Sequence, residues 1–493
     1  MLADSYKAGH FAQYPDTKRM TAYGEFRQGY GGDKEDTRVL FYGIRYVVDT
    51  FVARKWTRED VERADVFFSQ HAAPANGPYP FPKDLFLRFV EENDGYFPVT
   101  LQALPEGSCV HAHVPVYQIT AEEPYAKLVT FLETLLTMVW YPTTVATLSR
   151  RARDVIASAF EESVDGGAGS PLLGSRLHDF GFRGCTCVEQ SVIGGCAHLL
   201  NFEGSDTMSA AFYAQFELNG GKPVATSIPA TEHSVMTSWA SERDAVANMV
   251  SKYGSGIFAC VMDSYDYAKA LSELLPSVAQ EQVAQGGYMV LRPDSGDPVE
   301  CVLMALRAGE KVFGCNVNSK GFKVIKGCGV IQGDGVGLPM IGAILRAAHD
   351  AGFSAENVAF GMGGGLLQKV NRDTMSFATK LCHIRYADGS ERDVMKAPKT
   401  DFGKVSLPGV LSVRRVNGLP QVFPAASGSD SATRGEMLRV VYDKGPVAAA
   451  WDDFDTVKSR ASSEWAHLPR RAEALSLEIK ARMRALFPNL QLE

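Results

Sequence analysis

From about residue 175 to residue 376, short apolar runs alternate with stretches whose apolar residues recur at helical spacing. Each run is short enough to be a buried strand, and each ends in a cluster of polar residues and glycines. The run 288–291 shows this most clearly, because Arg292, Pro293 and Asp294 follow it at once. The pattern predicts strands that each pass into a polar loop and then into a helix.

Seven such clusters follow one another at regular intervals. Successive reference residues lie 27, 27, 30, 31, 40 and 29 positions apart, and a βα unit takes roughly 30 residues. The stretches 234–250, 265–275, 298–308, 338–350 and 366–376 are the expected helices. Seven units of this kind predict an irregular parallel α/β barrel whose post-strand loops share one mouth. The reference residues are Asp179, Asp206, His233, Asp263, Asp294, Asp334 and Gly363.

Outside this region the pattern changes to that of strands. Residues 99–120 alternate between apolar and polar positions, and the pairs Asp388-Gly389 and Asn417-Gly418 are typical of hairpin turns. Residues 455–487 are rich in arginine and glutamate at helical spacing, which predicts a solvated pair of helices that covers a sheet.

Composition narrows the class of protein. A chain of 493 residues would form roughly two to four domains. The net charge of −7 argues against a general nucleic-acid surface, and there is no uninterrupted apolar run of about 18 residues or secretory apolar core. The nine cysteines are scattered and odd in number. We therefore expect a cytoplasmic protein with reduced thiols that binds neither nucleic acid nor membrane.

The polar clusters carry groups suited to a phosphorylated sugar. Arg183, Arg292 and Arg372 offer planar forks for phosphate, and Asp263 and Asp294 offer oxygens for Mg²⁺ or for ribose hydroxyls. The run 361–365 is rich in glycine and precedes an expected helix, an arrangement that lets a backbone approach an anion. For any single aspartate a helix N-cap is the simpler interpretation, and for the glycines a turn. Seven clusters at one barrel mouth favour a site.

Together these clusters resemble the nicotinamide phosphoribosyltransferases, which are type II phosphoribosyltransferases. The resemblance runs nearly end to end and includes several long motifs in order. It implies an irregular parallel α/β barrel at 171–376, joined to a β-rich α+β domain that both chain ends form, at 1–170 and 377–493. The matching segments are 4–7, 140–142, 177–184, 201–207, 227–234, 263–266, 292–296, 331–336 and 363–369.

The resemblance also implies a reaction and an assembly. Nicotinamide and phosphoribosyl pyrophosphate would give nicotinamide mononucleotide and pyrophosphate in NAD salvage, with Mg²⁺. The protein would be a homodimer with both active sites at the interface. His233 matches the histidine that ATP phosphorylates in this family, which predicts ATP as an activating co-substrate.

Roles for individual residues follow from the same resemblance. Phe180 would stack on the pyridine ring, opposite Tyr6 of the partner subunit, while Asp206 would accept a hydrogen bond from the carboxamide and Ser227 would line the same slot. The carboxylates Asp263 and Asp294 would stabilise positive charge on the ribose, with Mg²⁺ near them. The remaining contacts to ribose, phosphate and pyrophosphate would come from Arg183, His233, Arg292, Gly333, Asp334, Gly363, Gly364 and Arg372, and from Arg27 and Lys380 of the partner.

Three other interpretations stay open at this point. A nicotinate or quinolinate phosphoribosyltransferase would share the fold, and Asp206 favours the amide substrate over these. A phosphate-binding barrel lyase or aldolase would need a Schiff-base lysine, which none of the seven clusters offers. A non-enzymatic binding protein is the third. The loop 399–404 is shorter than in the family, so it stays open which of Lys396, Lys399 and Lys404 reaches the pyrophosphate.

Overall fold

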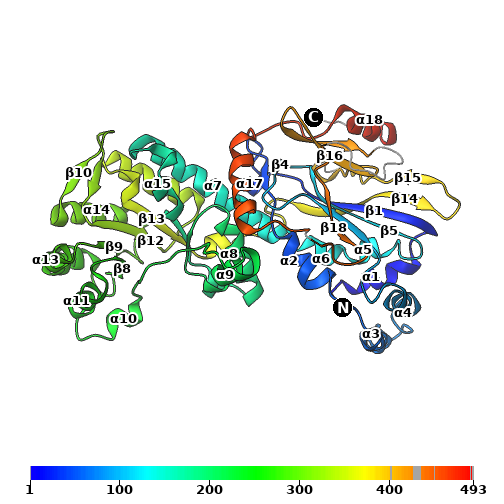
Figure 1. The fold of residues 1–493 in the computed structure, drawn as a ribbon, viewed down its shortest axis with the longest axis horizontal. Coiled ribbons are helices and arrows are strands. Elements are labelled where there is room, and N and C mark those ends of the chain that lie inside the picture. Colours follow the sequence, from blue (N-terminus) through cyan, green and yellow to red (C-terminus); the bar gives the residue numbers. More distant parts are fainter. Residues whose placement is uncertain (1, 400–401, 426–434, 449, 489, 491–493) are drawn as a thin grey trace. The chain divides into compact units, whose positions relative to one another are not determined.

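The structure is a computed structural model that describes residues 2–399, 402–425, 435–448, 450–488 and 490. Two compact units divide the chain (Figure 1): a terminal unit, Met1–Thr147 with Asn371–Glu493, and a barrel unit, Leu148–Val370. Compared with the sequence-based boundaries, residues 148–170 join the barrel unit and residues 371–376 join the terminal unit.

Helix α7, Trp140–Ser163, contains the first boundary. Its second part is bound to barrel residues: Ser149 Oγ lies 2.9 Å from His198 Nδ1, and the Ser163 carbonyl accepts from Asn318 Nδ2 at 2.7 Å. These contacts explain why the helix, which the sequence pattern alone leaves with the N-terminal part, continues into the barrel unit.

The terminal unit is built on a six-stranded antiparallel sheet to which both chain ends contribute. Strand β1, Thr17–Phe26, lies at its middle, between β14, Phe377–Tyr386, and β5, Pro115–Glu122. The remaining strands are β3, Thr100–Ala103, β15, Glu391–Asp393, and β18, Arg439–Asp443. The expected β-rich domain formed from both ends of the chain is therefore present.

Smaller elements complete this unit. The two predicted hairpins are confirmed, because Asp388-Gly389 joins β14 to β15 and Asn417-Gly418 joins β16, Leu411–Val416, to β17, Leu419–Pro424. Strand β2, Arg38–Leu40, pairs with β4, Cys109–His111. The predicted C-terminal helix pair is α17, Phe454–His467, and α18, Leu477–Leu486. The other helices are α1 Ser5–Gly9, α2 Ile44–Val47, α3 Arg58–Gln70, α4 Lys83–Glu92, α5 Leu128–Phe131 and α6 Glu133–Thr137.

The barrel unit contains a six-stranded, all-parallel sheet in the order β7-β6-β13-β12-β9-β8. Five of the seven predicted runs contain one of these strands, whereas the run at 199–200 lies at the end of α8, Val188–Leu199, and β7 falls in the polar cluster that follows it. At the remaining run, 224–229, Thr226 bridges Gly204 of β7, and the next residue, Ala230, bridges Ala259 of β8, both in parallel. This segment links the two edge strands and completes the irregular barrel. The strands are β6 Leu177–Asp179, β7 Gly204–Ser205, β8 Ile257–Val261, β9 Tyr288–Arg292, β12 Cys328–Gln332 and β13 Val358–Met362.

Helices follow the strands, but two of the five predicted spans differ. The span 234–250 is divided between α10, His233–Thr237, and α11, Glu242–Tyr253, because the Ser241 side chain caps a new helix by accepting from the Asp244 amide. The predicted helix at 338–350 is α15, Leu338–Asp350, and that at 298–308 lies within α14, Pro298–Phe313. The helix predicted at 366–376 is wrong: α16 spans only Gly364–Leu367. Asn371 Oδ1 accepts from the amides of Asp373 and Thr374 at 2.9 and 3.0 Å, and this local turn replaces a further helical turn.

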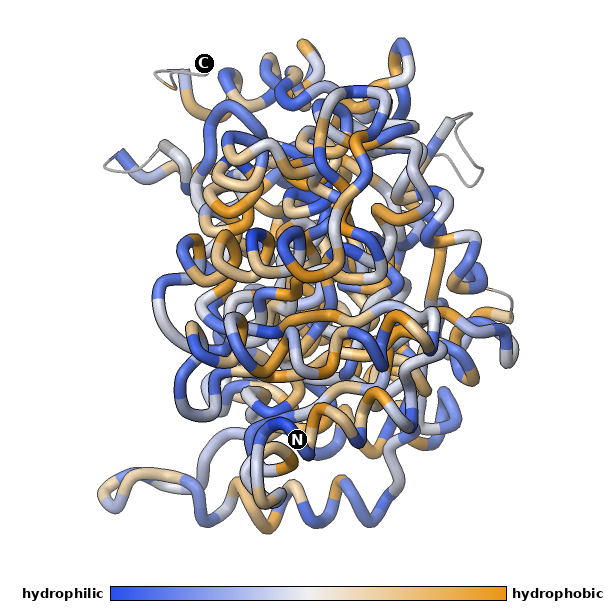
Figure 2. The backbone as a smooth tube through the Cα atoms, turned by 90° about the vertical axis from the view of Figure 1, so that its left-hand side faces the viewer, coloured by the Kyte–Doolittle hydropathy of each residue, from blue (hydrophilic) through white to orange (hydrophobic). Residues whose placement is uncertain are grey.

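The other helices of this unit are α8 Val188–Leu199, α9 Met208–Tyr213, α10 His233–Thr237, α11 Glu242–Tyr253, α12 Tyr267–Lys269 and α13 Leu275–Gln285. A short antiparallel pair, β10 Cys315–Val317 and β11 Lys323–Ile325, extends the loop after α14. Along the helical turns of the chain, hydrophobic and hydrophilic residues alternate every few positions (Figure 2), as expected for helices that pack one face on a core.

Burial follows the predicted pattern in both units. Ala259, Val290 and Ile331, one from each of three neighbouring barrel strands, form a buried apolar cluster against which Phe180 packs. All nine cysteines are free thiols. Within the described part of the chain, no helix has the length and apolar character needed to cross a membrane.

Candidate active site

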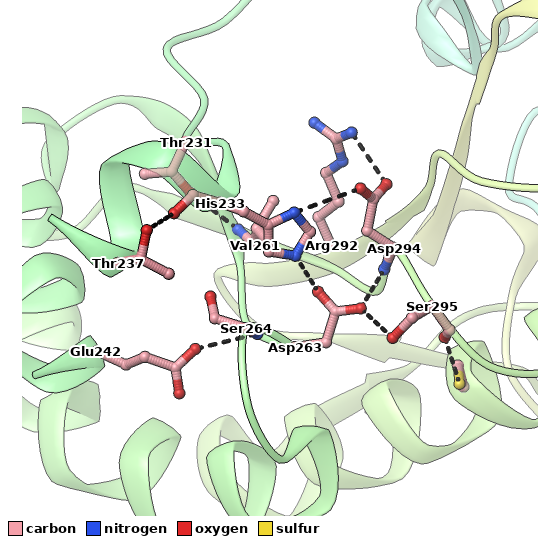
Figure 3. Close-up of polar contacts among 11 residues, drawn as sticks. Thr231, His233, Thr237, Glu242, Val261, Asp263, Ser264, Arg292, Asp294 and Ser295 are labelled. Carbon is pink, nitrogen blue, oxygen red and sulfur yellow. Dashed lines mark hydrogen bonds and ion pairs between the residues drawn. The ribbon is translucent and has the colours of Figure 1, made fainter.

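Residues after β8 and β9 and at the start of α10 form a hydrogen-bonded group that we call the acid cluster: His233, Asp263, Arg292, Asp294 and Ser295 (Figure 3). Asp263 is its centre. Its carboxylate accepts from His233 Nε2 at 3.1 Å, from the Asp294 amide at 3.0 Å and from Ser295 Oγ at 2.5 Å. The side chain of Asp263 is 2% exposed, and that of His233 is 45% exposed. The buried carboxylate therefore holds a histidine ring that is itself open to solvent.

These donors decide the charge state of Asp263. Burial on its own raises the pKa of the carboxyl, but the hydrogen bonds from Ser295, the Asp294 amide and His233 outweigh burial and hold its pKa below the usual range. Asp263 is therefore ionised at neutral pH, with both oxygens already engaged. A carboxylate in this state can orient a histidine but has little capacity left for a metal ion.

The acid cluster continues into an arginine. Arg292 Nη2 donates to Asp294 Oδ1 at 3.0 Å, and Asp294 Oδ2 lies 3.8 Å from His233 Nδ1. A Cβ at position 333 would come within 3.2 Å of Arg292 Nε, so glycine at this position leaves the guanidinium its room. The centre of that guanidinium lies 5.3 Å from the centroid of the Phe180 ring, which connects the cluster to a neighbouring cavity.

This cavity has a volume of about 290 Å³, and we call it the ring slot; Phe180, Phe182, Arg183, Asp206, Thr207 and Arg292 line it. Phe180 follows β6 directly and packs over β13. A Cβ on Gly361 would stand 2.0 Å from Phe180 Cε2, so this glycine is needed for the ring to lie where it does. A small slot lined by two aromatic rings and four polar or charged side chains suits a planar heterocycle with polar substituents.

Asp206 supplies the carboxylate of the ring slot. Ser227 Oγ donates to Asp206 Oδ1, and the backbone amide of Asp206 donates to the Asp179 carbonyl at 3.0 Å. The residue is exposed, and among the described residues its Oδ2 has no hydrogen-bond partner. The slot therefore presents a fixed acceptor that is free to receive an N–H from a ligand.

The structure draws attention to one residue that the sequence marked only as the reference position of its cluster, without a role. Asp179 lies directly behind the slot and is 0% exposed. Its Oδ1 accepts from the Gly181 amide at 2.7 Å, whereas its Oδ2 is buried and has no hydrogen-bond partner among the residues that the structure describes. Burial raises the pKa of this carboxyl to about 6. Asp179 ends an apolar run in the sequence, but nothing there distinguishes a buried carboxyl from an exposed one.

The two glycine loops at the ends of β12 and β13 also meet. A Cβ on Gly365 would lie 2.4 Å from the Val336 carbonyl, so the loop at 363–365 packs against the one that contains Gly333 and Asp334. Gln332 Nε2 donates to the Asp334 carbonyl at 2.8 Å and fixes that loop. Because α16 has four residues, an argument from the dipole of a long helix does not apply here.

Four predicted site residues lie in the terminal unit, so their roles at the site stay predictions. Tyr6 is 53% exposed on α1, and Arg27 Nε donates to the buried Glu25 at 3.0 Å. Arg372 is outside any helix, against expectation, and donates to the Phe377 carbonyl at 3.0 Å. Burial lowers the pKa of Lys380, which donates to the Thr379 carbonyl at 2.8 Å.

The question of a lysine in the short loop also stays open. Residues 400 and 401 lie outside the described residues, and Lys396, Lys399 and Lys404 all belong to the terminal unit. Across the described ranges, no group of three or more histidine, cysteine, aspartate or glutamate side chains is arranged to hold a metal ion.

Comparison with known proteins places this site in a family. Residues 175–445 match the family model described as "Nicotinate phosphoribosyltransferase (NAPRTase) family", and residues 1–101 match "Nicotinamide phosphoribosyltransferase, N-terminal domain". A nicotinamide phosphoribosyltransferase of Xanthomonas campestris pv. campestris is 39% identical over 476 residues, which cover 93% of this chain and 97% of the relative. The chain belongs to the nicotinate phosphoribosyltransferase family.

Other members agree with this assignment. A nicotinamide phosphoribosyltransferase of Acinetobacter baylyi is 29% identical and covers 94% of the chain and 96% of the relative. The fold is that of human nicotinic acid phosphoribosyltransferase, with a TM-score of 0.64, 18% identity and coverage of 99% and 100%. It is also that of nicotinate-nucleotide pyrophosphorylase from Pyrococcus furiosus, with a TM-score of 0.59, 14% identity and coverage of 94% for each chain. The chain is thus a pentosyltransferase, not a barrel lyase.

Proposed function

We propose that this protein converts nicotinamide and phosphoribosyl pyrophosphate to nicotinamide mononucleotide and pyrophosphate, as a step of NAD salvage. The observation that carries the proposal is the open Oδ2 of Asp206 beside the Phe180 ring in the ring slot. A pyridine ring would stack on Phe180, and its carboxamide N–H₂ would donate to Asp206. The names of the two bacterial relatives point to the same substrate.

The same carboxylate argues against nicotinate, the alternative substrate within this family. Nicotinate would bring its own carboxylate against Asp206 and would have no N–H to donate. Like charges about 4 Å apart at an effective dielectric constant near 20 repel by about 4 kcal/mol, which corresponds to a preference of roughly 10²–10³-fold for the amide.

The acid cluster suits the bond that must break. As C1′ separates from pyrophosphate, positive charge develops on the ribose and negative charge on the leaving group. Asp294, with the ionised Asp263 behind it, would stabilise the ribose charge, while Arg183 and Arg292 would stabilise the diphosphate. The pyridine nitrogen is already a nucleophile, so the step needs no general base.

Mg²⁺ fits this arrangement as an ion that the substrate carries. It usually keeps several waters and takes one or two carboxylates besides phosphate oxygens. Asp263 has both oxygens engaged, which leaves Asp294 Oδ2, 3.8 Å from His233, as the more accessible carboxylate oxygen. When bound, the ion would neutralise charge on the pyrophosphate; the residues near it would be Asp294 and the arginines.

His233 is the residue through which ATP would act. Asp263 accepts a hydrogen bond from Nε2–H, which leaves Nδ1 of this 45% exposed side chain with a lone pair, 3.8 Å from Asp294 Oδ2. Transfer of the γ-phosphoryl group of ATP to this nitrogen would release ADP and place negative charge beside the pyrophosphate site. Incubation with ATP should therefore leave an acid-labile phosphate on the wild-type protein and none on His233→Ala.

A homodimer would complete the site. Met208, Phe212 and Phe216 are 78%, 64% and 51% exposed and repeat every four residues from the start of α9, two positions after Asp206. Such an apolar stripe beside the ring slot would be covered by a second copy, which would bring its own Tyr6, Arg27 and Lys380 to the substrate. Nine free thiols agree with a cytoplasmic location.

The test is the product itself. Mass spectrometry of the reaction of nicotinamide with phosphoribosyl pyrophosphate should detect nicotinamide mononucleotide, with nicotinate turned over at least about 10²-fold less efficiently. Efficient turnover of nicotinate and none of nicotinamide would replace the proposal with the nicotinate reaction.

A further inference from the structure

Gln368 makes a contact that the proposed reaction does not yet use. It lies directly after α16, and its Nε2 donates to the Gly181 carbonyl at 3.0 Å and to Cys185 Sγ at 3.2 Å. The carbonyl acceptor fixes which end of the amide is nitrogen. Oε1 is then buried without a partner in the described part of the chain. A buried acceptor without a partner costs stability, so a functional role for the side chain would offset this cost.

Gly181 begins the turn that forms one wall of the ring slot. Its amide donates to Asp179 Oδ1 at 2.7 Å, and a Cβ on it would lie 2.7 Å from the Leu367 side chain. The next residues, Phe182 and Arg183, both line the slot. The turn is thus held by the strand on one side and by the α16 segment on the other.

The α16 segment is in turn part of the second glycine loop. The backbone amide of Gln368 donates to the Gly364 carbonyl at 3.0 Å, and a Cβ on Gly364 would lie 3.5 Å from Oε1 of the Gln368 side chain. Only a single short helical turn separates Gly364 from the residue that holds Gly181. If the 363–365 loop becomes more ordered, the side chain of Gln368 therefore transmits this order to the wall of the ring slot.

We propose that Gln368 is a positioning residue that couples phosphate binding at the 363–365 loop to ring binding in the slot. The inference rests on the proposed function, which places nicotinamide in the slot, and on the family resemblance, which assigns phosphate contacts to Gly363 and Gly364. A bound phosphate orders the loop and, through Gln368, the 181–185 turn. The ring then meets a wall that is already fixed, so it binds with a smaller loss of conformational entropy. By linkage each ligand tightens the binding of the other.

The test is a binding cycle on the full-length protein. Calorimetry measures the Kd of nicotinamide with and without saturating ribose 5-phosphate, a phosphate probe that cannot react. In the wild type we expect ribose 5-phosphate to tighten nicotinamide binding about 5-fold or more. In Gln368→Met, which keeps the volume of the side chain and removes the donor, we expect the ratio of the two Kd values to fall to about 1.

Gln282 provides a matched control. Its Nε2 also donates to a glycine carbonyl, that of Gly254 at 3.2 Å, and its Oε1 is also buried without a described partner, but it lies on α13. Gln282→Met should lower the melting temperature to a similar extent and keep the wild-type ratio. This comparison separates a positioning role from a general loss of stability.

The outcomes are decisive in both directions. A wild-type ratio in Gln368→Met, or no tightening in the wild type, overturns the proposal. If Gln368→Met does not fold, Gln368→Glu takes its place, since the carboxylate has nearly the same shape and cannot donate to Gly181. Product formation is measured separately: a wild type that makes no nicotinamide mononucleotide refutes the proposed function, whereas failure of the ratio alone refutes only the coupling.

Discussion

The acid cluster and the ring slot lie next to each other at one barrel mouth and are built in opposite ways. In the acid cluster each charged side chain already has protein partners, and Asp263 alone accepts three hydrogen bonds. In the ring slot the carboxylate is left incomplete, because Asp206 Oδ2 has no partner among the described residues and borders an open cavity. Arg292, which lines the slot and is paired with Asp294, is the residue that the two parts share.

The difference follows from what each part has to do. Groups that stabilise charge in a transition state work best when they are fixed beforehand, because no reorganisation is then needed during the reaction. Groups that select a substrate need free hydrogen-bonding capacity that only the right ligand satisfies. Substitutions should therefore slow the reaction when made in the acid cluster, and should change affinity and selectivity when made in the ring slot.

The largest effect is expected for Asp263→Asn. The amide keeps the shape but loses the charge, and its nitrogen cannot accept a hydrogen bond. Because His233 binds one oxygen of Asp263 and Ser295 and the Asp294 amide bind the other, the variant loses the partners of one of these two oxygens. We expect kcat to fall by about 10²–10³-fold, comparable to removal of a preorganised charge-stabilising group.

Ser295→Ala should reduce kcat less than Asp263→Asn does. It removes one of the three donors to Asp263 and keeps the charge. Initial-rate measurements should show a loss of kcat of about 10-fold, at the lower end of the about 1.5–3 kcal/mol that a hydrogen bond to a charged group contributes, because Asp263 keeps its charge and its other two donors. A loss in Asp263→Asn that is no larger than in Ser295→Ala would contradict the view of Asp263 as the centre of the cluster.

The second prediction concerns selectivity in the ring slot. In Asp206→Asn the repulsion of nicotinate disappears, and the new side-chain amide can donate to a carboxylate. The ratio of kcat/KM for nicotinamide to that for nicotinate should fall by about 10²-fold. Competition assays with both substrates measure this ratio directly. An unchanged ratio would remove the role assigned to Asp206.

Much of this arrangement is visible in the sequence, for a physical reason. Parallel strands bring their carboxyl ends to one edge, so residues that follow successive apolar runs must meet there. Asp206, His233, Asp263 and Arg292 are brought together as that rule requires. The strand pattern is strong because buried strands are apolar throughout, and the turn pairs Asp388-Gly389 and Asn417-Gly418 need a positive φ that few residues tolerate.

What the sequence did not reveal depends on contacts between distant segments. The stretch 366–376 has helical spacing, yet the side chain of Asn371 binds two backbone amides and ends the helical pattern. Asp179 is buried because α8 packs over it through Gly195, where a Cβ would lie 3.1 Å from its Oδ2. No local pattern in a single sequence records such packing, so the buried carboxyl emerges only with the fold.

Asp179 gives the third prediction, which concerns stability. Its pKa is about 6 in the folded protein and 3.8 in its unperturbed state. Well below pH 3.8 the carboxyl is protonated in both states, whereas above pH 6 the folded state must bury a charge, so this group lowers stability as pH rises from 3.8 through about 6. Asp179→Asn should therefore stabilise the protein at pH 8 by about 1–3 kcal/mol and much less at pH 4.

Thermal unfolding of both proteins at the two pH values measures this difference. Asn keeps an oxygen for the Gly181 amide, so the turn that it holds should be intact. Asp206→Asn, whose side chain is exposed, serves as the control and should show no comparable gain at pH 8. An equal gain for Asp179→Asn at both pH values would mean that packing, and not titration, is responsible.

The smallest effect is expected for Phe180→Leu, which replaces the ring at the slot with an aliphatic side chain. Offset stacking of two rings contributes about 0.5–1.5 kcal/mol beyond burial, so the KM for nicotinamide should rise about 2–10-fold. Arg292 lies 5.3 Å from the Phe180 ring but is also held by Asp294, so the KM for phosphoribosyl pyrophosphate should change less than about 3-fold. Initial rates with each substrate varied in turn separate the two constants. Equal changes in both would show that the ring slot and the acid cluster are not separable, and the contrast between a fixed charge site and an open recognition site would then not hold.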